Sequence, residues 1–556
     1  MKNPLYTCTL FLVLTGCSTN PAINEVQNSS PIRFNSLGFA PESPKTVTIT
    51  GEHCRKILIR NTSDSTIAFK AKARGPYTCS NTGVQFWKAD FSGLQNTGSY
   101  VVEVPGVAVS APFNIENDIY RFPYVTAMRA FYLWRCGTEV LGTHCGDTFW
   151  HAACHTNDGY WHYAAIGNKH TNGTGGWHDA GDYGKYTVNA SITLANLFMA
   201  WEFFGEKLIR IGLDIPLSEP ALPEFLSELK WETDFLLKME YPDGSGRISH
   251  KLTGLSFEPF VMPEFDTAKR YFTKWSSAAT AHYAAVMAMA ARYFQPYDSN
   301  YAKTCLKASI RSYNYLAENP AEVHCDMKEF STGAYQAGDS EPRMWAAAEL
   351  WETTGDARYL ADFETRAAVY QTKIDLSWDW DNVKNLGMYT YLLSKRNGRN
   401  TRLFGLIKTS LVQVADSIVN NTRTDAFGRP FNEYYWGCNG TIARLSLTLA
   451  IANKQAPDKK WLTAAHEISA HLFGKNIYAR SFITGLGINP PMFPHDRRSG
   501  ADNVAAPWPG YIVGGGHTPN GWLDEEDSYS TNEIAINWQA PLVFLLAWLA
   551  VETNGQ

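Results

Sequence analysis

Short runs of apolar and β-branched residues dominate the N-terminal part of the chain. Residues 47–50, 56–59 and 100–104 are rich in Val, Ile and Thr, and clusters of Gly, Pro, Asn and Ser separate them. Such residues favour extended backbone, and turn residues at short intervals favour antiparallel pairing. Several short strands close together are typical of a small sandwich of two sheets, so we expect a β-sandwich over residues 31–116.

The pattern changes after Pro123, where long segments rich in Ala and Leu follow one another with apolar positions at helical spacing. The connections between them are long, aromatic and rich in Gly and Pro, and such loops are often functional. We therefore predict a helical toroid over residues 120–553, with a binding cleft built from loops at one end. The clearest helical segments are 125–133, 188–204, 224–239, 278–294, 302–316, 344–354, 406–419, 442–452, 462–473 and 532–551.

The first residues have the pattern of an export signal. An apolar run at 5–14 follows a positively charged start and is too short to span a bilayer. It ends in Leu-Thr-Gly-Cys, which resembles the bacterial lipobox. Residues 1–17 are thus predicted to be a lipoprotein signal with Cys17 as the lipidated N-terminus; a plain secretory signal cleaved nearby is the alternative. Ser18 favours the outer membrane, and polar residues 18–30 are expected to form a tether. These features indicate the cell envelope of a Gram-negative bacterium, either its outer membrane or its periplasm.

Composition sets limits on function. The 556-residue chain has 45% hydrophobic and 19% charged residues, which is typical of globular proteins. Its net charge of -5 argues against nucleic acid as the main partner. Aromatic residues make up 13% and include 18 Trp, whose faces stack on sugar rings but also fill cores. Carbohydrate binding is thus favoured only modestly, and we expect a monomer.

Ten cysteines are present, and two of them lie in the signal segment. Export permits disulfide bonds between the others. Cys54 with Cys79, and Cys305 with Cys325, are expected pairs on proximity in the sequence alone, although spacing does not determine pairing.

Two aspartates three residues apart, Asp179 and Asp182, lie in a Gly-rich loop just before a predicted helix. Small Ala180 and Gly181 between them let the backbone turn tightly, so both carboxylates can face one point. Paired carboxylates can hold and polarise a water while one of them takes its proton, and a nearby helix N-terminus favours the ionised form. A calcium loop or a helix N-cap is the alternative, because Asp is common in both.

Glu533 stands at the start of the last apolar segment, which is predicted as a helix. Tyr529, Ile534 and Trp538 are near it in the sequence, so its carboxyl group can occupy a partly desolvated position. Desolvation raises the pKa of a carboxyl group and keeps it protonated, as a general acid requires. The alternative is a solvated glutamate in the first turn of a helix.

The segment 481–498 forms an irregular loop, because it contains two glycines and three prolines. This loop presents His495 and Arg497, and both side chains can donate hydrogen bonds to sugar hydroxyls. A structural loop with a surface arginine is the alternative.

Together these three segments resemble glycoside hydrolase family 9. The loop 481–497 matches the His/Arg signature of that family at every defined position, and the Asp-Ala-Gly-Asp core resembles its base loop. Segments 33–39 and 90–92 resemble the immunoglobulin-like domain that precedes many such catalytic domains, so the resemblance covers residues 31–553. The second signature of the family is matched by Trp522, Asp524, Tyr529, Glu533 and Ala535, with Gln539 in place of the usual Asn.

This resemblance implies an (α/α)6 barrel and an inverting hydrolase of β-1,4-linked sugar chains whose chemistry needs no cofactor. Asp182 would be the general base, Asp179 would help to hold the water, and Glu533 would protonate the leaving oxygen. Inversion requires the base and the acid to lie about 6.5–9.5 Å apart. Substrate contacts are implied for His495, Arg497 and Trp436, with Asp524 and Tyr529 supporting the cleft, and Trp378, Trp380 and Trp508 are weaker candidates for stacking.

Some members of the family with the sandwich domain bind structural zinc near the base loop. Cys136, Cys154 and His155 resemble three of their ligands. The fourth ligand in those relatives is a His, but Lys185 stands at its position, and a protonated Lys does not bind a metal.

Cys145 or His178 is the candidate substitute for the missing ligand. A disulfide, either Cys136–Cys154 or Cys145–Cys154, is the alternative to a zinc site. Calcium is common in the family, but no loop of this sequence identifies a site for it.

The leading hypothesis is a β-1,4-glucanase of the cellulase type. The enzymatic alternative is an exo-β-D-glucosaminidase acting on chitosan-type oligosaccharides, as some family 9 lipoproteins do. A surface glycan-binding lipoprotein without catalysis is the hypothesis from another class, and the intact Asp179, Asp182 and Glu533 argue against it. The lipid anchor favours short oligosaccharides that reach the cell envelope over crystalline cellulose.

Overall fold

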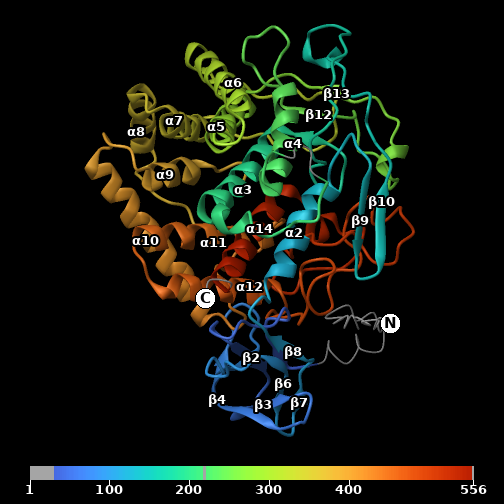
Figure 1. The fold of residues 1–556 in the computed structure, drawn as a ribbon, viewed down its shortest axis with the longest axis vertical. Coiled ribbons are helices and arrows are strands. Elements are labelled where there is room, and N and C mark those ends of the chain that lie inside the picture. Colours follow the sequence, from blue (N-terminus) through green and yellow to red (C-terminus); the bar gives the residue numbers. More distant parts are fainter. Residues whose placement is uncertain (1–29, 217–220, 554–556) are drawn as a thin grey trace, which may run out of the picture.

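The computed structural model describes residues 30–216 and 221–553, which form two domains in contact (Figure 1). The smaller domain, drawn in blue, is a β-sandwich, and the larger domain consists mainly of helices. The proposed signal with Cys17, and the tether apart from Ser30, lie outside the described residues. Within those residues no helix combines the length and the apolar character needed to cross a membrane.

The strands of the smaller domain follow the order β1-β2-β5-β4-β3-β6-β7, with β8 beside β6, and every pairing is antiparallel. The long strand β4 pairs with β3 and with β5, so it joins the two halves of the sandwich. Alternate side chains point inward, and Val47, Ile59 and Val102 are completely buried. The predicted sandwich is confirmed. Its strands are β1 (Ile32–Arg33), β2 (Thr46–Thr50), β3 (Lys56–Asn61), β4 (Ile67–Thr78), β5 (Gln85–Asp90), β6 (Gly98–Val104), β7 (Ala108–Val109) and β8 (Phe113–Ile115).

The helices of the larger domain alternate along the chain between an outer and an inner ring, which confirms the (α/α)6 barrel. Contacts close the inner ring from α14 through α3, α5, α7, α9 and α11 back to α14. The outer helices are α2 (Arg121–Leu133), α4 (Glu224–Lys238), α6 (Ser299–Glu318), α8 (Ala357–Val369), α10 (Thr401–Thr424) and α12 (Lys459–Leu472). The inner helices are α3 (Thr187–Leu208), α5 (Ser277–Phe294), α7 (Ser340–Thr354), α9 (Lys384–Leu393), α11 (Cys438–Gln455) and α14 (Ile536–Thr553).

The side-chain pattern explains which ring each helix joins. The Ala-rich helix α5 is buried around nearly its whole circumference, as an inner helix must be. The outer helix α10 buries a single stripe of residues three or four positions apart, and its other side chains face solvent. The stripe consists of Leu403, Ile407, Leu411, Ala415, Ile418 and Thr422.

Short elements in the connections arrange the loops at one end of the barrel. Strand β11 follows the segment of Asp179 and Asp182, and it pairs with β12, with Lys185 opposite Leu252. This pairing places the loop 254–262, which follows β12, next to the two aspartates. The short elements are β9 (Val140–His144), β10 (Asp147–His151), η1 (His162–Ala164), β11 (Lys185–Tyr186), β12 (Lys251–Thr253), η2 (Pro263–Phe265), β13 (Tyr271–Phe272) and α13 (Tyr529–Asn532).

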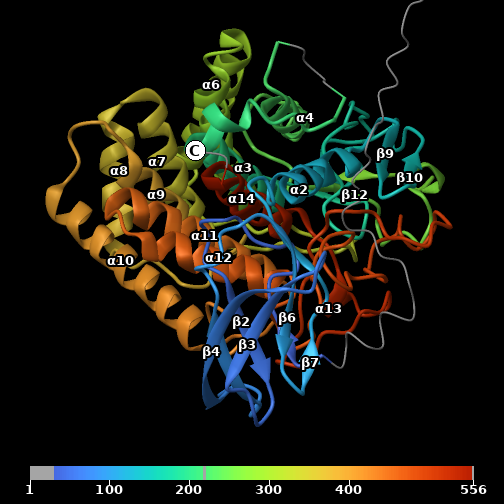
Figure 2. The same cartoon turned by 60° about the horizontal axis from the view of Figure 1, so that its bottom comes forward.

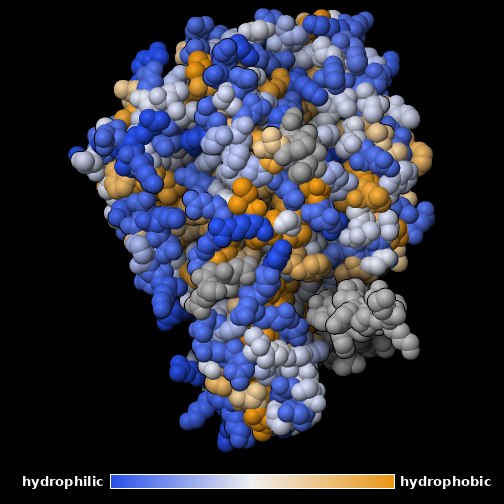
Figure 3. Space-filling model, viewed as in Figure 1, coloured by the Kyte–Doolittle hydropathy of each residue, from blue (hydrophilic) through white to orange (hydrophobic). Residues whose placement is uncertain are grey.

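The sandwich packs beside α12 and the segment that follows it (Figure 2). Ser36 contacts this segment at two points: its backbone N–H donates to the carbonyl of Phe473 over 2.9 Å, and its hydroxyl oxygen accepts from the N–H of Ile488 over 2.9 Å. Buried Lys475 binds the hydroxyl of Thr46 at 2.7 Å and the carboxylate of Glu467 at 2.6 Å. Hydrogen bonds and an ion pair therefore stabilise the interface between the two domains. On the face seen in Figure 3, hydrophilic residues cover most of the sandwich and apolar residues lie in separate groups over the barrel.

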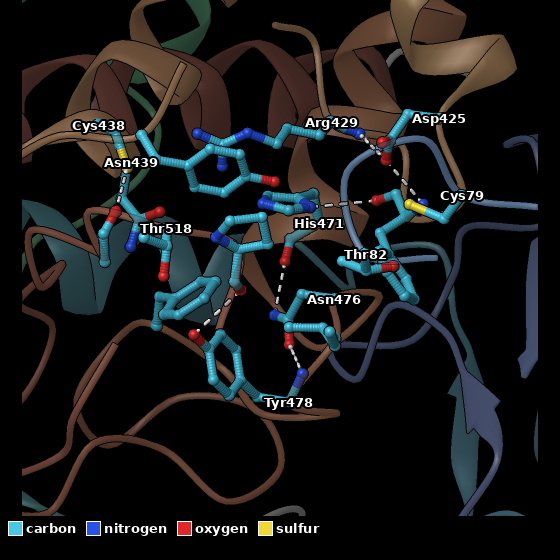
Figure 4. A pocket seen from close by; sticks show the side chains of 16 residues that line it. Cys79, Thr82, Asp425, Arg429, Cys438, Asn439, His471, Asn476, Tyr478 and Thr518 are labelled. Atoms are coloured by element: carbon cyan, nitrogen blue, oxygen red, sulfur yellow. Dashed lines mark hydrogen bonds between the residues drawn. The ribbon is translucent and has the colours of Figure 1, made fainter. Parts of the chain in front are cut away.

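A small cavity lies where the sandwich meets the barrel (Figure 4). Its volume of about 30 Å³ is enough for one or two waters. Cys79 and Thr82 line it from the sandwich, and His471, Asn476 and Tyr478 line it from the barrel. The residues that line it include none of the proposed catalytic residues.

The expected disulfides are wrong, because Cys54, Cys79, Cys305 and Cys325 are free thiols. Cys54 lies in the core of the sandwich, whereas Cys79 packs in a separate cluster against the barrel. Cys305 is buried on α6, and the thiol of Cys325 donates to the carbonyl of Lys274 instead.

Candidate active site

Three segments that are far apart in the sequence meet at one end of the barrel. Ala180 pairs with Ala535 in an antiparallel bridge, and His495 pairs with Glu533 in a parallel one. The N–H of Arg497 donates to the carbonyl of Gly181 over 3.2 Å. The structure therefore brings together the acidic pair, the His/Arg loop and Glu533.

Gly181 permits this close approach. A Cβ atom at this position would lie 2.1 Å from the carbonyl oxygen of His495, which is far inside van der Waals contact. Any side chain here would push the acidic loop away from the His/Arg loop. The Gly between the two aspartates is thus required by the neighbouring backbone as well as by the turn.

Asp179 is buried and fully held by neighbouring side chains. Its Oδ1 accepts a hydrogen bond from Asn189 Nδ2 at 2.7 Å, and its Oδ2 accepts one from the hydroxyl of Tyr335 at 2.6 Å. Burial and the charge of Asp182 raise its pKa well above the usual value, and the two hydrogen bonds oppose this shift. Asp179 is thus a rigid, hydrogen-bonded partner to the second aspartate.

Asp182 has one engaged and one unengaged oxygen. Its Oδ2 accepts from the N–H of Gly184 and from the hydroxyl of Tyr186, both at 2.9 Å. Its Oδ1 makes no hydrogen bond within the described part of the chain. Two donors on one oxygen fix the carboxylate, so the other oxygen can accept a proton from a water.

Glu533 lies in extended backbone between α13 and α14. The prediction that it opens the last helix is wrong: the bridges of Glu533 with His495 and of Ile534 with Val513 hold this stretch extended, and α14 starts at Ile536. Burial and the charges of Asp182 and Asp179 raise the pKa of Glu533 well above the usual value. A carboxyl group in this environment stays protonated and can donate a proton.

Aromatic rings continue the site away from the carboxyl groups. Trp436 and Tyr529 are 45% and 54% exposed, and their ring centroids lie 5.5 Å apart. The ring of Tyr529 lies 6.1 Å from that of His495, whose Nδ1 is 2.7 Å from the carbonyl oxygen of Glu526. Exposed rings in a row suit the apolar faces of sugar units.

The remaining residues that the sequence suggested for substrate contact lie outside this row of rings. Asp524 accepts hydrogen bonds from Arg480 and from the backbone of the 492–493 segment, so it supports the His/Arg loop. Trp378 and Trp508 are fully buried in the core. Trp380 is partly buried and lies edge-on to Tyr335, with centroids 5.1 Å apart, so it borders the site.

The sequence reasoning missed four polar residues of the site: Asn189, Tyr186, Tyr335 and Glu258. Asn189 and Tyr186 follow the acidic pair within ten residues, and a buried Asn in the first turn of a helix is a usable signal. Tyr335 and Glu258 come from distant loops, where no local pattern marks a contact with the acidic pair.

A cluster of sulfur and imidazole groups lies under the acidic loop. Cys136 Sγ is 3.6 Å from His155 Nδ1, Cys154 Sγ is 3.8 Å from His178 Nε2, and the two imidazole nitrogens are 3.4 Å apart. All four ligand atoms lie within 4.8 Å of one another. Tetrahedral zinc with Zn–S near 2.3 Å and Zn–N near 2.0–2.1 Å requires ligand separations of about 3.3–3.8 Å. The donor set and its spacing therefore fit a closed zinc site.

The structure decides between a zinc site and a disulfide here, and it identifies the fourth ligand. Cys136 and Cys154 are free thiols, so neither proposed disulfide is present. His178, and not Cys145, completes the group of four. Lys185 instead forms an ion pair with Asp158 at 3.2 Å.

Comparison with known proteins gives matches over almost the whole chain. The family "Glycosyl hydrolase family 9" matches residues 120–546, and "Cellulase N-terminal ig-like domain" matches residues 27–109. Endoglucanase D of Acetivibrio thermocellus is 48% identical over 541 residues, covering 96% of this chain and 86% of the relative. A cellodextrinase of Butyrivibrio fibrisolvens is 31% identical, covering 93% of this chain and 99% of the relative. The crystal structure of a Zn-binding triple mutant of the family 9 endoglucanase J30 has a TM-score of 0.86 at 31% identity, covering 92% of this chain and 99% of that one.

Proposed function

Because the chain belongs to glycosyl hydrolase family 9, we propose that it hydrolyses β-1,4-glycosidic bonds of glucan chains with inversion at the anomeric carbon. The observation that carries this function is that the bridges of Ala180 with Ala535 and of His495 with Glu533 bring the loop of Asp182 and the segment of Glu533 together. Asp182 keeps one carboxylate oxygen without a partner among the described residues, and burial together with the charges of Asp182 and Asp179 raises the pKa of Glu533. One group can thus take a proton while the other gives one.

The proposed mechanism assigns one step to each carboxyl group. Asp182 removes a proton from a water, and Asp179, fixed by Asn189 and Tyr335, holds that water. The water attacks the anomeric carbon as Glu533 protonates the leaving oxygen, so a single displacement inverts the configuration. These steps need only the carboxyl groups and water.

The names of the relatives favour glucan as the substrate over glucosamine oligomers. Incubation with cellotetraose and with glucosamine tetramer, followed by chromatography and NMR of the first products, tests the proposal. We expect hydrolysis of cellotetraose with the α-anomer formed first. Cleavage of the glucosamine tetramer alone would establish the exo-glucosaminidase alternative, and binding without cleavage of either would establish the glycan-binding one.

We also propose that the cluster of Cys136, Cys154, His155 and His178 holds one structural zinc. The distances between the ligand atoms support this, and Asp266 Oδ2 lies 3.1 Å from His155 Nε2, as a carboxylate that orients a metal-bound imidazole does. Zinc here would stiffen the acidic loop, because His178 directly precedes Asp179.

Removal of zinc is expected to lower the thermal stability of the protein, because a metal that binds only the folded chain stabilises it. Metal analysis of the purified protein should give about one zinc per chain, and a strong chelator should lower Tm by roughly 5 °C or more. Cys154→Ser should contain no zinc and show no response to the chelator, whereas Cys305→Ser, a change at a buried thiol outside the cluster, should respond as the parent does. An unchanged Tm and zinc-free parent protein would refute the site.

The proposed cell-envelope location depends on Cys17, which lies outside the described residues, and it stays a prediction. Fractionation of cells that express Cys17→Ala tests it, because loss of the lipid anchor should move the protein from the membrane to the soluble fraction.

A further inference from the structure

The loop 254–262 is fixed against the acidic loop. The N–H of Tyr183 donates to Glu258 Oε1 over 2.9 Å, and the hydroxyl of Tyr183 donates to the carbonyl of Val261 over 2.6 Å. Arg497 Nε donates to the carbonyl of Glu258 over 3.0 Å. Because residues of the site hold both Glu258 and Val261, this part of the loop keeps a fixed position beside the acidic loop.

Glu258 is the charged residue of this loop, and it lies beside the proposed base. Its Oε1 forms an ion pair with Arg497 Nε at 2.7 Å. Tyr183, whose N–H binds Glu258, directly follows Asp182, and burial together with the charge of Asp182 raises the pKa of Glu258. Its Oε2 makes no hydrogen bond within the described residues and is not among their buried unpartnered polar atoms. Oε2 therefore keeps some accessible surface, although only 9% of the side chain is exposed.

Arg497 offers hydrogen-bond donors beside the acceptor oxygen of Glu258. Glu258 engages its Nε twice, whereas its two terminal nitrogens make no hydrogen bond within the described residues and are not among the buried unpartnered atoms there. The ion pair thus orients the guanidinium group and leaves its two outer nitrogens with some accessible surface, although only 7% of the side chain is exposed. A carboxylate oxygen and guanidinium donors side by side can bind neighbouring hydroxyl groups of a sugar.

An exposed aromatic ring stands directly next to this pair. Phe257 is 46% exposed although it is apolar, and the Cζ of Arg497 lies 5.5 Å from its ring centroid. Phe260 lies at 5.6 Å from the same atom and stands edge-on to His495, with centroids 5.3 Å apart. An apolar ring held at the surface by a fixed loop offers a flat face for a sugar ring to cover.

We propose that Phe257 and Glu258 form a sugar subsite on the base side of the cleft, in which Phe257 stacks on a glucosyl unit while Glu258 Oε2 and the outer nitrogens of Arg497 bind its hydroxyl groups. This subsite rests on the proposed hydrolysis of glucans. It takes a neutral sugar with adjacent equatorial hydroxyl groups, and it makes Glu258 a specificity-determining residue that also positions Arg497.

The test measures binding separately from turnover, by titrating cellotetraose into variants in the Glu533→Gln background with calorimetry. Adding Phe257→Ala should weaken the affinity about 10-fold, since the stacked face is lost, and Phe257→Tyr should keep it. The control is Phe122→Ala, which removes a similarly exposed ring on the outer helix α2 and should bind as the background does. Equal affinity of the Phe257→Ala and background proteins would overturn the stacking role.

The second variant is Glu258→Gln, which keeps the shape of the side chain and removes its charge. It should also weaken the affinity about 10-fold, with Tm of the free protein checked in parallel, whereas the exposed Asp527→Asn should change nothing. Unchanged affinity in Glu258→Gln would overturn the role of Glu258. Failure of the proposed function is a different result, because it would be seen as absence of cellotetraose cleavage by the protein with intact Glu533, Phe257 and Glu258.

Discussion

Glu533→Gln is expected to lower turnover of cello-oligosaccharides by about 1000-fold while leaving their binding nearly unchanged. The amide has the same size but cannot protonate the leaving oxygen, and general acid–base catalysis contributes about 10²–10⁴-fold. Kinetics with cellotetraose measure the loss, and calorimetry measures binding. Glu525→Gln, a change at an exposed acid eight residues earlier, is the matched control and should keep full turnover.

Two further readouts separate an acid from a structural residue at this position. Aryl glycosides with acidic leaving groups need little protonation, so they should be cleaved by Glu533→Gln far better than cellotetraose is. The raised pKa of Glu533 means that its active, protonated form is lost as pH rises through that pKa. The parent should therefore lose activity on the alkaline side, and the variant should lack this limb. Normal turnover of cellotetraose in the variant would reject the acid assignment.

The raised pKa of Glu533 also determines how the stability of the fold should depend on pH. Because the folded state favours the neutral form of Glu533, ionisation of this group at high pH weakens folding. The stabilisation is complete below the ordinary pKa of a glutamate and is lost as pH rises through the folded value. Glu533→Gln removes this penalty, so its Tm at alkaline pH should be equal to or above that of the parent.

Asp182→Asn is expected to lower turnover by about 1000-fold as well, because an amide cannot take a proton from the attacking water. Its Oδ2 contacts with Gly184 and Tyr186 permit an amide oxygen in the same place, so the fold should be kept. Azide restores the reaction, since this small anion attacks without losing a proton. The product should be the α-glucosyl azide, which NMR identifies.

The anomer of that product decides the role of Asp182. A β-azide would indicate attack from the other face of the sugar and would exclude Asp182 as the base of an inverting reaction. Asp527→Asn, a change at an exposed aspartate, is the control and should neither lose turnover nor respond to azide.

The elements could be predicted because their patterns are local. β-branched runs located three strands of the sandwich, β2, β3 and β6, and helical spacing located ten of the helices, since burial on one stripe or all around leaves a regular signal. The last helix was placed too early, because Ile534 and Ile536 fit both an apolar helix and an extended bridge. Distant partners decide between them, because Glu533 bridges to His495 and Ile534 bridges to Val513.

The site required more than local patterns. Nothing in the spacing of Asp182 and Glu533 indicates that they meet, and that expectation came from the resemblance to a family. The disulfide expectations were wrong for the same reason, because proximity in sequence does not fix the distance between two Cα atoms. Tyr335 and Glu258 were missed because single residues in long loops carry no periodic signal.

The contact of Ser36 with Phe473 and Ile488 has a consequence for how this enzyme can be divided. Phe473 lies before the His/Arg loop (481–498) and Ile488 lies within it, so the sandwich holds the first part of this loop in place. Removal of the sandwich would leave the carbonyl of Phe473 and the N–H of Ile488 without these partners. We therefore expect the barrel without the sandwich to hold His495 and Arg497 less firmly and to be less active than the whole chain.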